Sequence, residues 1–254
     1  MNCFIESLYI SPVKSLSLEK LNSTFIKKDI GLLNDRLFAF TRNIDIKDAK
    51  IFEKKPNKRK LNNFLSLKNT PVLNKYNFSF NDNKLYLRII NKIIFSISIK
   101  DTNDYSNLSE ELIKLEPSIR GPIYLLMNSF HPFFDTMPKN SISLININSI
   151  KDLNKKLSIN IEKERFRGNI YIDGLVPWDE FKFIGKKLKI NNLVFRVERK
   201  IPRCSATNLK PNTDNVTINL PKELKRIYNH IYMGIYLTPL GDGRINIYDK
   251  VKFL

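Results

Sequence analysis

An alternation of apolar and charged residues runs from residue 194 to residue 200 and ends at Pro202. Alternation with a period of two predicts a half-buried strand, and proline ends the strand because it has no N–H to give to a sheet. Short apolar segments separated by turn-forming residues recur along the rest of the chain. The pattern therefore predicts an α+β, mostly β fold with a few short helices.

The positions of the elements follow from the same patterns. Asn107 has capping-box spacing with Glu110, Asn148 or Ser149 can cap a further helix, and Pro221 suits a first helical turn. Helices are therefore predicted at residues 108–115, from 148 or 149 to 157, and at 221–229. Strands are predicted at residues 2–10, 25–26, 37–40, 63–67, 78–80, 84–90, 93–99, 123–127, 141–147, 169–172, 187–190, 193–200, 233–237, 244–247 and 251–254. Residues 45–59 are charged and irregular, which predicts an exposed loop.

A length of 254 residues allows one large domain or two small ones. No internal repeat or long linker divides the chain, and we place the boundary in the stretch between Glu116 and Ser141, giving domains at 1–120 and 121–254. No apolar run approaches the ~20 residues that a membrane span needs. The first residues lack a basic segment followed by an apolar one, so no signal peptide is expected and a cytoplasmic protein is predicted.

Cys204 follows the strand predicted at residues 193–200 and comes directly after Pro202 and Arg203. A neighbouring guanidinium favours the thiolate, which is both the nucleophile and the metal ligand. The alternative is a small buried apolar residue with a charged neighbour, since free cysteines are often buried. Both interpretations stay open on the local sequence.

The other metal-binding residue types are scarce. The chain has two cysteines, Cys3 and Cys204, and two histidines, His131 and His230. Two cysteines form no disulfide framework, and iron–sulfur clusters take four thiolates. Two histidines leave little material for a zinc or copper site. Any metal is therefore expected to be bound mainly through a cofactor, with Cys204 as the best protein ligand.

A second stretch, Arg-Phe-Arg-Gly-Asn-Ile at residues 165–170, places arginines and Asn169 just before a predicted strand. Together with Pro-Arg-Cys-Ser-Ala-Thr at residues 202–207, it resembles the MOSC domain, named after the C-terminal domain of molybdenum cofactor sulfurase. Ser-Pro-Val-Lys-Ser at residues 11–15 and the stretch at residues 31–38 resemble the β-barrel domain that precedes MOSC in many of these proteins. The resemblance implies two β-barrel-like domains with a cofactor site between them.

The polar residues of these motifs suit a phosphorylated, polar heterocycle. Arginine binds phosphate with two donors, lysine acts as a point charge, and hydroxyl and amide groups add hydrogen bonds. No Walker or dinucleotide glycine motif is present, which argues against nucleotide folds. The candidate cofactor-binding residues are Lys14, Ser15, Arg36, Ser141, Arg167, Asn169, Arg203 and Tyr236.

The resemblance to proteins similar to the mitochondrial amidoxime-reducing component implies that these residues hold the pyranopterin molybdenum cofactor. It also implies that Cys204 is the metal ligand and the catalytic residue. The chain departs from the family at three places. The loop before Ser141 is longer, so that the polar ligand there is Asn140 or Ser141. Pro202 replaces a small polar residue, and Tyr248-Asp249 stands where Gly-Asp is usual. The loop at residues 130–139, rich in aromatic residues and proline, is predicted to be either a lid or a packed connection.

Two functions are compatible with this site. One is a molybdenum oxidoreductase that reduces small N-hydroxylated compounds or N-oxides. Because the chain has neither cluster cysteines nor a flavin motif, its electrons would come from a separate ferredoxin-, flavin- or cytochrome-type protein. The other is a sulfur carrier, with a persulfide on Cys204, or a cofactor-binding protein in cofactor maturation.

The net charge of +18 permits binding to nucleic acid, anionic lipid or an acidic protein. The lysines are scattered along a sequence that is rich in Lys, Asn and Ile throughout, and this argues against a nucleic-acid module. The densest basic run lies at residues 54–60. We expect a solvated lysine surface, or a basic face that meets an acidic reductase.

Overall fold

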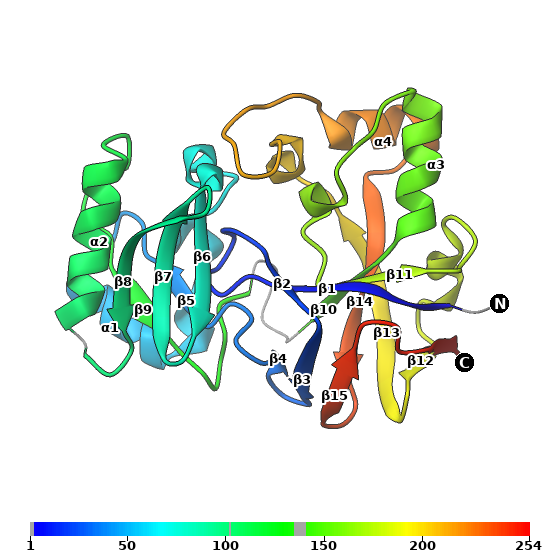
Figure 1. Ribbon diagram of the computed structural model, residues 1–254, viewed down its shortest axis with the longest axis horizontal. Coiled ribbons are helices and arrows are strands. Elements are labelled where there is room, and N and C mark those ends of the chain that lie inside the picture. The colour runs from blue at the N-terminus through cyan, green and yellow to red at the C-terminus, as the bar shows by residue number, and fades with distance from the viewer. Residues whose placement is uncertain (1–2, 102, 135–140) are drawn as a thin grey trace.

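The computed structural model describes residues 3–101, 103–134 and 141–254. Figure 1 shows two lobes side by side. The smaller lobe contains β5–β9, α1 and α2, and the larger lobe contains β1–β4, β10–β16, α3 and α4. The N-terminal strands therefore lie with the C-terminal half of the chain.

An eight-stranded sheet forms the centre of the larger lobe. Its strands, in spatial order, are β16 (Val251–Phe253), β12 (Lys187–Ile190), β13 (Leu193–Pro202), β14 (Tyr232–Pro239), β10 (Ile142–Asn146), β11 (Ile170–Asp173), β1 (Phe4–Ile10) and β2 (Glu19–Leu21). The pairing is antiparallel except between β10 and β11, which are parallel and joined through α3 (Ile147–Leu157). β12 and β13 form a hairpin through a two-residue turn in which Asn191 has a φ of 51°, as such turns require.

Both faces of this sheet are covered by apolar layers. On one face, Ile5, Leu8 and Ile10 of β1 pack with Ile26 and Ile245 of a three-stranded sheet. That sheet consists of β15 (Gly243–Asn246), β3 (Ser23–Lys27) and β4 (Gly31–Leu32). On the other face, α3 and α4 (Leu220–Tyr228) cover a second apolar cluster. Ile5 and Leu8, three positions apart, lie on the same face because the register of β1 shifts between Ile5 and Ser7, whereas Tyr9 lies in the cluster on the other face.

The predicted α+β, mostly β class is confirmed, but the sheets are open ladders and not closed barrels. β1 approaches the strand at the far edge only through a bridge between Phe4 and Lys250, next to β16. Flanking backbone hydrogen bonds, such as Val251 N–H to the Cys3 carbonyl at 2.8 Å, support this contact. The two ends of the ladder are therefore brought together without a continuous closing strand pair.

The smaller lobe is built on a meander of β6 (Tyr76–Asn81), β7 (Lys84–Ile89) and β8 (Lys92–Ser98). Asp82 and Asn83 both have positive φ in the β6–β7 turn, as their residue types predict. α2 (Asn103–Leu115) packs on β8. β5 (Phe38–Phe40) pairs with β9 (Leu125–Met127) beside α1 (Ile46–Lys54). Short 3₁₀ turns occur at Pro56–Lys58, Leu61–Asn63, Pro71–Lys75, Lys163–Phe166, Asp179–Phe183 and Ser205–Asn208.

Several predicted elements differ from those observed. α1 forms inside the stretch predicted to be an irregular loop, because Asp45 caps it and Ala49 is buried against the smaller lobe. Residues 63–67 are not a strand: only Phe64 forms a bridge, to Thr41. α3 is capped by Asn146 in place of Asn148 or Ser149.

The proposed division at 120/121 stays a prediction. The strand pairing places β1–β4 in the lobe that contains residues 142–253.

Candidate functional site

A cavity of about 510 Å³ lies between the two lobes. It is lined from the smaller-lobe side by residues 61, 62 and 66–69, and from the larger-lobe side by the end of β13 and by β14, with the loop after β1 also in its wall. Every predicted site residue except Asn169 lines it: Lys14, Ser15, Arg36, Ser141, Arg167, Arg203, Cys204 and Tyr236. The fold thus brings together side chains that are up to 222 positions apart in the sequence (236 − 14).

Cys204 is exposed at this cavity, in the loop that follows β13. Its backbone carbonyl accepts hydrogen bonds from Thr207 N–H at 3.1 Å and Thr207 Oγ1 at 2.8 Å, which fix the loop. The other cysteine, Cys3, is buried, and burial raises the pKa of its thiol to about 12. Cys204 is therefore the thiol that a ligand in the cavity can reach.

Arg203, next to Cys204, is buried in the wall of the cavity. Its guanidinium donates to the Met233 carbonyl through Nε at 3.0 Å and again through Nη2, and to the Phe166 carbonyl through Nη1 at 2.7 Å. Burial lowers the pKa of this guanidinium. Arg203 thus ties the cysteine loop to β14 and to the loop before β11.

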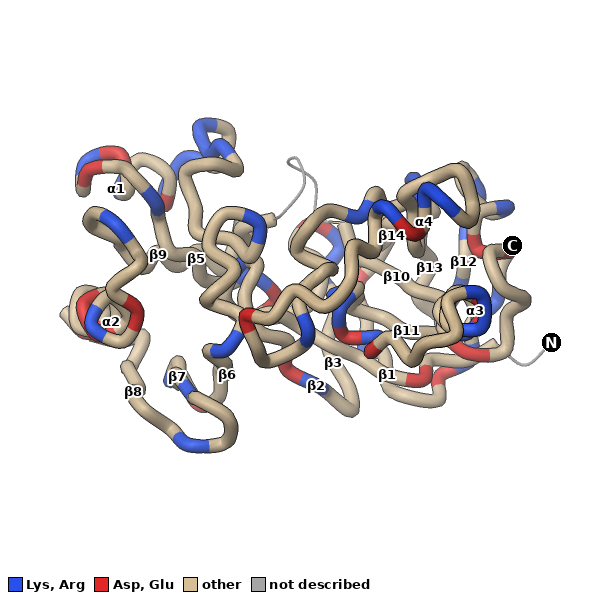
Figure 2. Tube along the Cα trace, turned by 90° about the horizontal axis from the view of Figure 1, so that it is seen from above, with Lys and Arg blue, Asp and Glu red and all other residues tan. Residues whose placement is uncertain are grey.

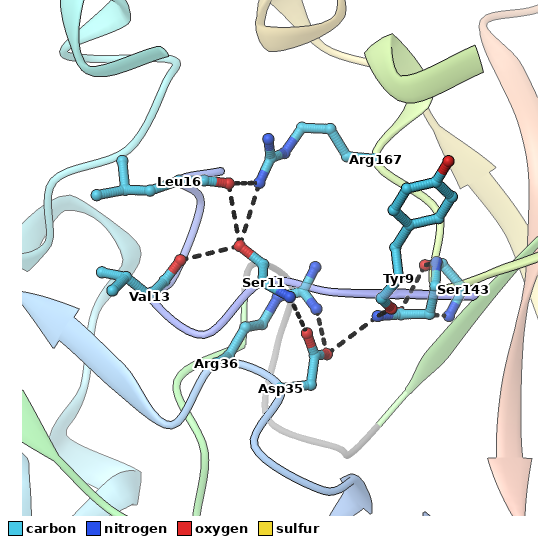
Figure 3. Close-up of polar contacts among 9 residues, drawn as sticks. Tyr9, Ser11, Val13, Leu16, Asp35, Arg36, Ser143 and Arg167 are labelled. Atoms are coloured by element: carbon cyan, nitrogen blue, oxygen red, sulfur yellow. Dashed lines mark hydrogen bonds and ion pairs between the residues drawn. The ribbon is translucent and has the colours of Figure 1, made fainter. Parts of the chain in front are cut away.

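Arg167 connects the larger-lobe side of the site to the loop after β1 (Figure 3). It has a φ of 50°, and its Nη2 donates to the Leu16 carbonyl and to Ser11 Oγ, the latter at 3.3 Å. Ser11 Oγ in turn donates to the carbonyls of Val13 and Leu16 at 2.9 and 3.0 Å. These bonds hold the loop that contains Lys14 and Ser15, whose side chains are 3.3 Å apart.

Asp35 is a buried acceptor beneath the cavity that the sequence patterns did not single out as a site residue. Its Oδ1 accepts from Ser11 N–H at 2.7 Å, and its Oδ2 accepts from Arg36 Nη1 at 2.5 Å and from Asn169 Nδ2 at 3.2 Å. Asp35 therefore joins Arg36 to the large sheet (Figure 3). Its position beside Arg36 was the available signal.

Asn169 lies below the cavity, where it links three strands. Its Oδ1 accepts from Ser143 Oγ at 2.7 Å and Ser143 N–H at 3.1 Å, and its Nδ2 also donates to the Tyr9 carbonyl at 3.2 Å. In this structure Asn169 positions β1, β10 and β11, and its predicted role as a direct cofactor ligand stays a prediction.

Ser143 and Tyr236 face each other in the β10–β14 pair, and both line the cavity. The Tyr236 ring lies 5.5 Å from Arg199 Cζ. Ser143 was missed because a serine inside an apolar run has no local signal, whereas Ser141 begins the strand. Asn140, the alternative to Ser141, lies outside the described residues, as does the second half, residues 135–139, of the predicted lid at 130–139. Other polar lining residues that sequence reasoning missed are Asn62, Ser66, Lys68, Asn69 and Thr207.

The lining fits an anionic, polar cofactor with a soft metal. Lys14, Arg36 and Arg167 are cations suited to phosphate, and a cysteine sulfur is a soft ligand. A volume of about 510 Å³ is within the range of small-molecule sites. Within residues 3–101, 103–134 and 141–254, no cluster of three His, Cys, Asp or Glu side chains could hold a bare metal ion.

No helix in the described part of the chain is long and apolar enough to cross a membrane.

Comparison with protein families matches residues 133–252 to the MOSC domain. No curated protein matches the chain. Among solved structures, the YUAD protein from Bacillus subtilis is similar at 11% identity and a TM-score of 0.47, covering 99% of this chain and 94% of that one. YiiM from Geobacillus stearothermophilus (15% identity, TM-score 0.36) and YiiM from Escherichia coli (9%, 0.34) each cover 44% of this chain and 53% of their own.

Proposed function

We propose that the chain binds the pyranopterin molybdenum cofactor in the cavity between its lobes, because residues 133–252 match the MOSC domain, a family associated with this cofactor. The observation that supports this most directly is the position of Cys204. It is the exposed one of the two cysteines, and it shares the cavity with three cations from separate segments. A soft ligand and phosphate-binding charges are the two features that such a cofactor needs.

Different residues would bind different parts of the cofactor. The Cys204 sulfur would ligate the metal, and the charges of Lys14, Arg36 and Arg167 would bind the anionic part. Ser15, Ser143 and Tyr236 provide hydroxyl groups at the cavity wall for the polar ring system. Asp35, Asn169 and Arg203 hold these residues in place through the buried hydrogen bonds described above.

We propose that the chain reduces N-hydroxylated compounds or N-oxides. In this reaction the N–O bond breaks, two electrons and two protons are consumed, and the oxygen leaves as water. The bound molybdenum centre supplies the two-electron chemistry. The protein would position the small substrate in the cavity that Cys204 lines.

The electrons for this reaction would come from a separate protein. The chain has only two cysteines, of which Cys3 is buried, so it cannot hold an iron–sulfur cluster of its own. It also has no glycine motif for binding a dinucleotide. We expect a donor of the ferredoxin, flavin or cytochrome type.

The exposure of Cys204 also supports a second candidate function. An accessible cysteine sulfur can hold a persulfide, so that the chain could carry sulfur or bind the cofactor during maturation. The two functions differ in what the purified protein contains: an enzyme retains stoichiometric molybdenum, whereas a carrier retains labile sulfur on Cys204.

The test is elemental analysis with an absorption spectrum, on protein from cells with intact cofactor synthesis. We expect about one molybdenum per chain and, with reduced viologen as donor, turnover of an amidoxime. Cys204→Ser should keep the fold, because this side chain is exposed, but should lose the activity. Cys3→Ala is the matched control and should remain active. Full activity of Cys204→Ser would contradict both candidate functions; persulfide without molybdenum in the wild-type chain would favour the carrier.

A further inference from the structure

A run of basic residues borders the cavity on the smaller-lobe side. Residues 54–68 contain six cations and no acidic residue. Five of the six are exposed lysines, which we call the basic rim: Lys54, Lys55, Lys58, Lys60 and Lys68. Lys68 itself lines the cavity, as do Leu61 and Asn62, which follow Lys60 directly. Lys68 therefore lies at the proposed cofactor site, and the other four lysines of the basic rim precede it on the same segment.

The charge of the basic rim is not neutralised within the described part of the chain, where no ion pair joins any of these five lysines to an acidic residue. Lysines elsewhere do form such pairs: Lys163 with Glu6 at 2.7 Å, and Lys75 with Glu116 at 2.8 Å. Figure 2 shows that lysines and arginines occur on both lobes. Glu53 directly precedes Lys54, so the basic rim is distinguished by its position beside the cavity and not by basic content or by a lack of acidic residues nearby.

The sixth cation, Arg59, fixes the basic rim to the cavity wall. Its guanidinium donates to the carbonyls of Phe52 and His131, both at 2.6 Å, and its Cζ lies 4.0 Å from the centre of the Phe133 ring. Burial lowers the pKa of Arg59 to about 10, so it remains charged at neutral pH. Phe133 is buried, and the next residue, Phe134, lines the cavity. The lysines are thus displayed by an anchored segment.

Exposed apolar side chains lie within this basic surface. Leu61 is 47% exposed and Phe130 is 75% exposed, and Phe130 adjoins His131, which Arg59 contacts. Apolar contacts surrounded by charged residues are the arrangement of a protein–protein interface. Nucleic acid and anionic lipid headgroups would bind the lysines but would not need exposed apolar side chains among them.

We propose that the basic rim docks an acidic electron-transfer protein of the ferredoxin class, an inference that rests on the proposed function. Lysines around a cavity mouth steer an acidic partner toward it, and the apolar residues hold the encounter complex. Each encounter would deliver one electron from the reduced cluster of the donor, which becomes oxidised, so two encounters supply the two electrons consumed for each N–O bond that breaks.

The experiment compares Lys58→Glu/Lys60→Glu with Lys250→Glu/Lys252→Glu. The control lysines are also exposed and lie around β16, at the opposite end of the molecule from α1 in both views. Each pair changes the net charge equally. The probe is an oxidised, acidic plant-type ferredoxin, and its Kd for the full chain is measured by calorimetry at low and at physiological salt. Turnover of an amidoxime is measured in parallel with reduced methyl viologen.

We expect the variant in the basic rim to raise the Kd at least tenfold and to flatten its salt dependence, whereas the control changes the Kd by less than about twofold, since distant exposed charges are screened. Viologen-driven turnover should be the same in all three proteins. An equal loss of ferredoxin affinity in both variants, or no ferredoxin binding to the wild-type chain, would overturn the inference. If viologen-driven turnover is still observed in that case, the proposed function is unaffected. Conversely, absent viologen turnover with selective ferredoxin binding would contradict the proposed function alone.

Discussion

At the scale of single residues, Arg203 and Cys204 are neighbours in sequence with different surroundings. The Cys204 side chain is exposed at the cavity, whereas the Arg203 guanidinium is buried and donates to two backbone carbonyls. The motif therefore combines a side chain that faces the cavity with a side chain that fixes the loop. This difference can be measured without any cofactor.

Arg203→Ala should destabilise the chain even when no cofactor is bound. It leaves the buried carbonyls of Met233 and Phe166 without their donor, at a cost of about 1–3 kcal/mol for each acceptor. Arg196→Ala, on the same strand, removes only an exposed pair with Glu198 and should cost less than about 1 kcal/mol. Urea unfolding of the cofactor-free proteins measures both. If Arg203→Ala is as stable as the wild type, the structural role of Arg203 is contradicted and only its predicted cofactor-binding role is left.

Glu180 is a second buried ionisable residue, located away from the cavity. Its carboxylate accepts from Asn146 Nδ2 at 3.0 Å and from Ser149 Oγ at 2.9 Å, and burial raises its pKa from 4.5 to about 7. Between pH 4.5 and about pH 7, Glu180 is protonated in the folded state and ionised in the unfolded state. Stability is therefore highest near the acidic end of this window and falls as the pH rises to 7, by about 3 kcal/mol at 1.36 kcal/mol per pKa unit.

Glu180→Gln should remove this loss, so that the difference in unfolding free energy between variant and wild type grows from pH 5 to pH 7. His230, in the same lobe, acts with the opposite sign, because burial lowers its pKa and its stability contribution rises with pH. Since His230 is present in both proteins, it cancels in the comparison. Urea titrations at several pH values provide the test, and parallel pH profiles would rule out Glu180 as the source.

At the scale of elements, the contact between β10 and β14 depends on Gly234. This residue has a φ of 79°, and a Cβ there would overlap the Leu144 carbonyl of β10. The neighbouring residues of β14 contribute the Met233 carbonyl that Arg203 contacts and the Tyr236 side chain in the cavity. The close approach of these strands therefore sets the geometry of one wall of the site.

Gly234→Ala should be strongly destabilising, whereas Gly185→Ala is its matched control. Gly185 has a similar φ of 81° but open space around a Cβ, so its substitution should cost only about 1–2 kcal/mol for the left-handed backbone. Gly234→Ala adds overpacking against backbone, typically about 1–3 kcal/mol more. Thermal unfolding of both variants measures the difference in destabilisation. An equal loss of stability in both would show that β10 shifts to accommodate the added methyl group.

At the scale of the whole molecule, the larger lobe is assembled from both ends of the chain. β1 lies between β11 and β2, and Ile5 and Leu8 are fully buried in the core of this lobe. The smaller lobe is inserted between these parts, and its entry and exit points are adjacent, since Asn128 N–H donates to the Leu37 carbonyl at 3.0 Å. The larger lobe is therefore discontinuous in sequence.

A fragment of residues 121–254 should fail to fold cooperatively, because it lacks β1 and the apolar residues that β1 adds to the core. A chain in which a short Gly-Ser linker joins Leu37 to Asn128 keeps these strands and should show a cooperative thermal transition with dispersed NMR amide signals. A well-folded 121–254 fragment would contradict this assembly and support the division predicted at 120/121.

Much of the fold class and of the site could be predicted from local patterns. Alternation identified the strands around residues 187–200, and residue type identified the turn at Asp82 and Asn83. These features depend on neighbours in sequence, because side-chain direction in a strand and left-handed backbone in a turn are set locally. Lys14, Arg36 and Arg167 were singled out among 43 lysines and arginines because the motifs that contain them resemble the MOSC domain and the domain that precedes it, and Cys204 because it also follows a predicted strand and an arginine.

Tertiary structure alone decided how these parts are arranged. The pairing of β1 with β11 joins residues more than 150 positions apart, and α1 forms where the pattern predicted a loop because the smaller lobe buries Ala49. Asp35 and Ser143 belong to the site only because folding brings them to Asn169, and Arg203 donates to carbonyls that approach it from other segments. Sequence determined which groups are present, whereas long-range packing determined which partners satisfy them, since a buried donor or acceptor takes the partner that the fold places within reach.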